Sequence, residues 1–112
     1  MTPPLRVALG EYDTGWHDPA TSLARATEVV RAGAAAGATL VVLPEMCTTG
    51  FTMDAAAHAE PLDGASVRAL GRIAAASGVH LLAGVAVKEE TSEGEQAVNM
   101  AINKDRILKL IN

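Results

Sequence analysis

Three carboxylates stand where an α/β sheet places catalytic groups. Glu11 and Asp13 follow an apolar run at residues 5–9, and Glu45 follows a second run at residues 39–43. Ligand sites in open α/β sheets lie beyond the carboxyl ends of the strands, so we expect these groups at one edge. A partly desolvated glutamate there has a raised pKa and can act as a general base. Glu45 is the best placed; a helix cap or a surface acid is the alternative.

A helix is predicted between these two runs. Asp18 followed by Pro19 is typical of a helix start, and apolar residues then recur at helical spacing up to Gly37. The run at residues 39–43 is continuously aliphatic or β-branched, which favours a central parallel strand covered on both faces. The expected core residues of the helix are Leu23, Ala26, Val30 and Ala34.

A second helix–strand unit is predicted after an irregular stretch at residues 44–63. Ser66 can cap this helix and Gly78 can end it. A third strand is expected at residues 79–87. The helix should bury the stripe formed by Val67, Leu70, Ile73 and Ala74.

The last part of the chain is predicted to form an antiparallel hairpin over residues 97–110. A polar connection at residues 88–96 leads to a strand at 97–102, residues 103–105 turn the chain, and residues 106–111 read as a further strand. The fold class is therefore α/β, a mixed sheet with two βα crossovers and a terminal hairpin, in one domain over residues 1–112. Because the final strand stops at Asn112 without a polar tail, we expect a domain truncated at its C-terminus.

Composition excludes several classes of protein. The 112 residues are 49% hydrophobic and 20% charged, which suits one small folded domain rather than a disordered chain. A net charge of −4 and 3% aromatic residues argue against nucleic-acid binding. The absence of a long apolar run or a signal-like start argues against a membrane role, and the lone Cys47 fits a cytoplasmic location.

Longer segments of the chain resemble the nitrilase, or carbon-nitrogen hydrolase, superfamily. The segment from Leu43-Pro44-Glu45-Met46 to Thr48-Thr49-Gly50-Phe51 is similar to the superfamily's glutamate segment. Further matches in the same order suggest its omega-amidase-like branch and cover essentially the whole chain. They include Tyr12-Asp13, Trp16, Asp18-Pro19, Gly37-Ala38, residues 60–64 (Glu-Pro-Leu-Asp-Gly), residues 84–86 (Gly-Val-Ala) and Val98-Asn99.

The resemblance implies the amino-terminal part of an αββα sandwich and a hydrolase with a Glu-Lys-Cys triad. Glu45 matches the glutamate, which serves as the base, while the cysteine attacks the carbonyl and the lysine stabilises the oxyanion. The implied reaction releases ammonia and an acid from a small amide, or opens a nitrile, without a cofactor. The resemblance also implies a homo-oligomeric full-length protein.

Neither Cys47 nor Lys109 matches the remaining triad members. The family's cysteine lies on a later strand, so Cys47 is interpreted as a core or pocket-wall residue. The family's lysine falls just past Asn112, so Lys109 is interpreted as an outward-facing strand residue. The 112-residue chain alone is then expected to be inactive. Glu11 replaces a common glutamine and Gly10 a usual aliphatic residue, so Glu11 can alter the charge of the site.

The sequence also agrees with two other hypotheses. The chain can be a catalytically silent module that acts, if at all, through association, because an unpaired apolar strand exposes backbone groups. It can also be a small receiver-like domain in which Glu11 and Asp13 hold a cation. No metal role is assigned to the histidines, and no phosphate-binding loop is present. The unassigned histidines are His17, His58 and His80.

Overall fold

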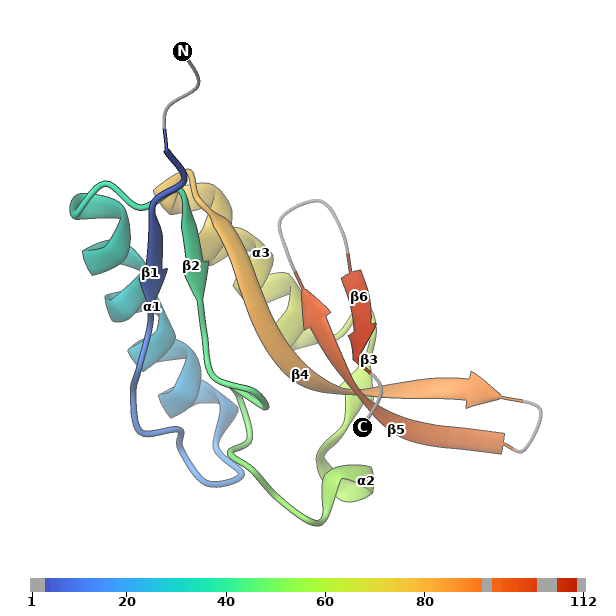
Figure 1. Ribbon diagram of the computed structural model, residues 1–112. Coiled ribbons are helices and arrows are strands. Elements are labelled where there is room, and N and C mark those ends of the chain that lie inside the picture. Colours follow the sequence, from blue (N-terminus) through green and yellow to red (C-terminus); the bar gives the residue numbers. More distant parts are fainter. Residues whose placement is uncertain (1–3, 92–93, 103–106, 111–112) are drawn as a thin grey trace.

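The computed structural model describes residues 4–91, 94–102 and 107–110, and the side chains of residues 4–89 among them. These residues form a mixed sheet with two long helices packed against it (Figure 1). Within this part of the chain, no helix is long and apolar enough to cross a membrane. In chain order the elements are β1 (Val7–Leu9), α1 (Pro19–Ala35), β2 (Leu40–Val42), α2 (Ala55–His58), β3 (Glu60–Pro61), α3 (Ala65–Ser77), β4 (His80–Thr91), β5 (Gly94–Ile102) and β6 (Ile107–Leu110).

The first half of the sheet is parallel and confirms the predicted strand–helix–strand units. β2 lies between β1 and β4, with Val41 opposite Ala8 on one side and Leu81 on the other. The connections that cross from β1 to β2 and from β2 to β4 contain α1 and α3. This arrangement brings the carboxyl ends of β1 and β2 to the same edge of the sheet (Figure 1).

The helix boundaries follow the predicted capping signals at three of four ends. The Asp18 carboxylate accepts a hydrogen bond from the Thr21 backbone N–H, and Pro19 begins α1. Gly37 and Gly78 follow the two helices with left-handed φ angles of 94° and 66°, which glycine adopts without steric cost. At the fourth end the structure differs, because Ser66 lies inside α3 and Gly64 occupies the cap position.

The core lies between the two helices and the sheet, as the periodicity predicts. Ala26, Val30, Leu70 and Ala74 are buried, while the other predicted helix residues are half-buried against the same cluster. The remaining buried residues of this cluster lie in β2 and β4, directly next to these strands, or in the turn after β2. They are Val41, Leu43, Cys47, Val79, Leu81, Ala83, Val85 and Val87.

The opposite face of the sheet is less covered than expected. Val41 is fully buried, but its strand neighbours Leu40 and Val42 are only half-buried. Leu5 and Leu9 on the first strand segment are 69% and 75% exposed. The prediction of a strand covered on both faces is therefore wrong for the described residues, because the helices cover one face only.

The second half of the sheet is antiparallel and more extensive than predicted. The polar residues 88–96 were expected to form a connection, but β4 continues to Thr91 and β5 begins at Gly94, so most of them pair in a long hairpin. β5 and β6 form the predicted second hairpin. The expected turn at residues 103–105 lies outside the described residues. The expected irregular stretch at residues 44–63 also contains the short α2 and β3, and β3 pairs with β4.

Candidate active site

The backbone turns sharply at Glu45, three residues after the end of the central strand β2. The Leu43 N–H still donates to the Leu82 carbonyl at 2.8 Å, so the strand pairing extends one residue beyond β2. Met46 then adopts a left-handed φ of 52°, which is unusual for a residue with a side chain. Both the Thr49 and Gly50 N–H groups bond back to the Met46 carbonyl. Glu45 thus lies at the start of a tight turn.

The turn after Glu45 is anchored in the protein interior. Cys47 and the two following threonines are at most 2% exposed, and the Cys47 N–H donates to the Gly84 carbonyl of β4 at 2.8 Å. The Thr48 hydroxyl is buried without a hydrogen-bond partner among the described residues. Glu45 itself is classed as exposed, whereas the sequence predicts partial desolvation. The turn is therefore fixed by buried residues, while Glu45 at its start is an exposed residue.

Tyr12 connects the loop after β1 to the turn after Glu45. Its hydroxyl donates a hydrogen bond of 2.9 Å to the Cys47 carbonyl, across 35 residues of sequence. Burial raises the pKa of the Tyr12 hydroxyl, so it remains a protonated donor over the physiological range. The bond holds the two loops that carry the candidate carboxylates together.

Cys47 is chemically unsuited to serve as a nucleophile. Its side chain is fully buried, and this burial raises the pKa of the thiol to about 12. A thiolate is the reactive form of cysteine, and it is scarce near neutral pH when the pKa lies so high. The interpretation of Cys47 as a core residue agrees with this position.

Glu11 and Asp13 lie in the loop after β1 and are both exposed. Among the described residues, no three His, Cys, Asp or Glu side chains come close enough together to hold a metal ion, so the cation-binding hypothesis gains no support there.

Gly10 fits closely at the start of this loop: a Cβ on it would lie 3.0 Å from Leu43 Cδ2 and 3.0 Å from Val29 Cγ2. The Leu43 and Val29 side chains therefore occupy the space that an aliphatic side chain at position 10 would need.

A stack of rings at the same edge was not predicted from the sequence. The His17 ring lies between the rings of Trp16 and His58, with centroid distances of 4.5 and 3.6 Å. His17 Nε2 is also 2.8 Å from Thr52 Oγ1, and its backbone N–H donates to the Thr49 carbonyl. The stack therefore attaches α2 and the turn after Glu45 to the loop before α1. The only signal in the sequence is the Trp16-His17 pair, which does not identify His58 as a partner.

Lys109 lies in β6, where its backbone pairs with Met100 of β5. The Lys109 side chain is not among the described side chains, so the expectation that it faces outward stays a prediction. Within residues 4–89, Glu45 is thus the residue whose position agrees best with the predicted catalytic edge, at the carboxyl end of β2 and joined through its turn to the loop after β1.

The sequence profile of the carbon-nitrogen hydrolase family matches residues 6–109, which is nearly the whole chain. The chain belongs to this family. The predicted resemblance is confirmed at this level, and the mixed α/β sheet matches the fold of solved nitrilase-superfamily proteins.

Several proteins resemble this family member in sequence and structure. Hydrolase Rv0480c of Mycobacterium tuberculosis is 37% identical over 83 residues, which cover 72% of the chain. XC1258 of Xanthomonas campestris, a CN-hydrolase superfamily protein, has a TM-score of 0.75 and 29% identity over 94% of the chain. Nit3 of Saccharomyces cerevisiae, from branch 10 of the nitrilase superfamily, matches in fold with a TM-score of 0.71 and 19% identity over 96% of the chain.

The chain spans only part of these relatives. The matched region is 29% of the mycobacterial hydrolase, 39% of XC1258 and 44% of Nit3. The described structure therefore corresponds to a minor part of each of these proteins. Glu45 and the turn that positions it lie within the part that matches.

Proposed function

We propose that the complete protein hydrolyses a small carboxamide to ammonia and a carboxylic acid, with Glu45 as the general base. The observation that carries this proposal is the position of Glu45, three residues after the central parallel strand β2, in a chain matched by the carbon-nitrogen hydrolase family over residues 6–109. The fixed turn at Met46 supports the assignment, because a base must be held in one orientation.

The proposed reaction follows the Glu-Lys-Cys scheme of the family. A cysteine thiolate attacks the amide carbon, and the new C–S bond produces a tetrahedral oxyanion that a lysine stabilises. Glu45 transfers the thiol proton to the departing nitrogen, so the C–N bond breaks and ammonia leaves. Glu45 then accepts a proton from water, which attacks the thioester and releases the acid and the free thiol.

The nucleophile and the lysine are proposed to come from sequence outside this chain. The buried Cys47 has a thiol pKa of about 12, which supports a different cysteine as the nucleophile. The 112-residue chain alone is then a partial, inactive domain. As part of the proposal, the complete protein is cytoplasmic and homo-oligomeric and uses no cofactor.

A carboxamide is favoured over a nitrile as the substrate. NitN of Nesterenkonia is an amidase whose solved structure matches this chain with a TM-score of 0.72. The match covers 97% of this chain and 45% of NitN. At 18% identity this likeness shows the fold alone, so the choice of a carboxamide is a proposal that the assay of ammonia release must decide. Both classes require the same base, and the assignment of Glu45 is independent of the choice.

A second candidate function is a catalytically silent module that associates through its sheet. The exposed apolar residues Leu5, Val7 and Leu9 favour it, because such a face is rarely left open in a monomer. A native protein near the mass of the 112-residue chain that self-associates would support this candidate. A monomer of that size with cooperative unfolding would contradict it.

The proposed activity is tested with Glu45→Gln in the complete protein, assayed by ammonia release from a panel of small carboxamides. We expect turnover to fall by about 100-fold or more, because a glutamine cannot accept a proton. Glu11→Gln is the matched control: it makes the same chemical change in the neighbouring loop and restores the residue common in the family. Normal turnover in the Glu45 variant would overturn the assignment.

A further inference from the structure

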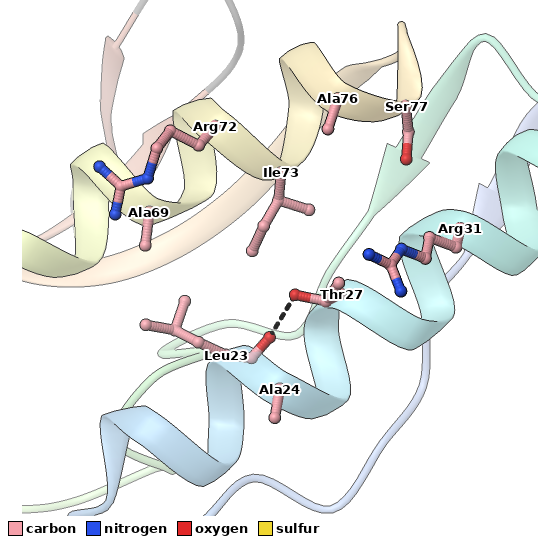
Figure 2. Close-up of a pocket in the computed structure, with 9 residues that line it drawn as sticks. All are labelled: Leu23, Ala24, Thr27, Arg31, Ala69, Arg72, Ile73, Ala76 and Ser77. Carbon is pink, nitrogen blue, oxygen red and sulfur yellow. Dashed lines mark hydrogen bonds between the residues drawn. The ribbon is translucent and has the colours of Figure 1, made fainter.

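A groove runs between α1 and α3 on the layer of helices that covers the sheet. Its volume is about 330 Å³. Figure 2 shows Leu23 and Ile73 pointing into the space between the two helices. The small side chains of Ala24 and Ala69 also line the groove. The groove is open to solvent and its lining is largely apolar, so it offers a surface that an apolar side chain can fill.

Arginines from both helices flank this apolar surface. Arg31 extends from α1 and Arg72 from α3, and both line the groove (Figure 2). Both are exposed, and within residues 4–89 neither guanidinium has an acidic partner. An unpaired arginine beside an apolar surface is well suited to form bidentate hydrogen bonds with an incoming carboxylate.

The two helices are basic within an acidic protein. Together they carry Arg25, Arg31, Arg68 and Arg72 but only one acid, Glu28, although the whole chain has a net charge of −4. This separation of charge attracts anionic groups to the helical layer and repels cationic ones. The ligand that the groove favours is therefore apolar on one side and acidic on its flanks.

We propose that the groove between α1 and α3 docks an amphipathic, acidic helix of a partner protein. Apolar side chains of that helix pack on Leu23 and Ile73, and its carboxylates pair with Arg31 and Arg72. Helix-in-groove recognition of this kind uses apolar residues at spacings of three and four, with charges at the rim.

Other occupants agree less well with the charges and the lining. A symmetric pairing with a second copy would bring the same basic patches together, which costs free energy because like charges repel. A membrane surface requires large apolar or aromatic side chains that insert, whereas small alanines line much of this groove. An acidic helix satisfies both the arginines and the apolar surface.

The test uses the complete protein and a synthetic peptide of about 15 to 20 residues, with leucines at helical spacing and glutamates on the flanks. We expect saturable binding by fluorescence anisotropy. Arg31→Glu and Arg72→Glu should each weaken it about tenfold or more, since each replaces an attraction with a repulsion. Ala24→Trp, an exposed change that fills the groove, should also weaken it.

Two controls separate specific docking from general attraction. Lys88→Glu makes the same change in net charge on β4 and should leave the peptide affinity unchanged. A peptide with lysines in place of the glutamates should not bind. The proposal would be overturned if Lys88→Glu weakened binding as much as the arginine variants, or if the basic peptide bound equally well. It would also be overturned if the protein did not bind the acidic peptide, or bound only phosphatidylserine vesicles.

Discussion

The Tyr12 hydroxyl donates a hydrogen bond of 2.9 Å to the Cys47 carbonyl and so joins the loop after β1 to the turn that begins at Glu45. Neither residue is proposed to take part in the chemistry, yet their contact fixes the position of the proposed base. The Cys47 N–H also bonds to the Gly84 carbonyl of β4. The turn is therefore held from two sides, by the loop after β1 and by the sheet.

Tyr12→Phe tests the contribution of this bond. The substitution keeps the ring but removes the donor, so we expect the free energy of unfolding to fall by about 1 kcal/mol. Urea unfolding measures the change. In the complete protein, turnover should fall less than in Glu45→Gln, because the base is loosened rather than removed. Unchanged stability and unchanged turnover would show that the bond does not hold the turn.

Alkylation should distinguish Cys47 from a reactive cysteine. Burial and a thiol pKa of about 12 leave little thiolate at neutral pH, so we expect iodoacetamide to label Cys47 only when the protein unfolds. Mass spectrometry of the peptide containing Cys47 gives the rate of labelling under native and denaturing conditions. Rapid labelling of the native protein would contradict the buried position.

The same thiol predicts a loss of stability at high pH. Burial raises the pKa of Cys47 from 9.0 to about 12, so between these values the unfolded chain has released the proton that the folded chain retains. Because the unfolded state then binds fewer protons, the free energy of unfolding falls as the pH rises through this window. Cys47→Ala should reduce that slope, measured by urea unfolding above pH 9. Burial also raises the pKa of Tyr12, so part of the slope should remain in the variant.

The Glu60 side chain binds the start of α3, where the sequence predicts that Ser66 caps the helix. The Glu60 carboxylate accepts hydrogen bonds from the Ser66 hydroxyl and, at 3.0 Å, from the Ser66 backbone N–H. Glu60→Ala should therefore lower the free energy of unfolding by about 1 to 2 kcal/mol, which urea unfolding can measure. Glu28→Ala, an exposed change within α1, is the control and should have little effect. Equal losses in the two variants would mean that the contact does not stabilise α3.

Local signals in the sequence predict the first half of the fold well. Asp18 with Pro19 marks the start of α1, and the spacing of Ala26 and Val30 gives its buried face, because these features depend on neighbouring residues alone. The long β4–β5 hairpin was not predicted, since the polar residues of its strands are typical of a loop. Pairing between the two strands overrides that local preference.

The candidate site was predicted only in part. Glu45 is identifiable because it follows an apolar strand, but its exposure depends on what covers it, and the sequence around it gives no information on that. The stack of His17 and His58 joins residues 41 positions apart, and the Glu60–Ser66 contact requires β3 to lie beside α3. Such contacts arise from the tertiary fold and leave no periodic pattern in the sequence.

Gly71 within α3 and Gly78 at the C-terminal end of that helix should respond in opposite ways to substitution by alanine. Gly71 lies within the helix and a Cβ there meets nothing within 4 Å, so Gly71→Ala should raise the free energy of unfolding by about 0.5 to 1 kcal/mol. Gly78 also has open space around it, but its φ of 66° is left-handed, so Gly78→Ala should lower that free energy by about 1 kcal/mol. Because neither methyl group makes a contact, urea unfolding of the pair isolates the backbone contribution. A loss of stability in both variants would show that Gly71 has a packing role that the structure does not contain.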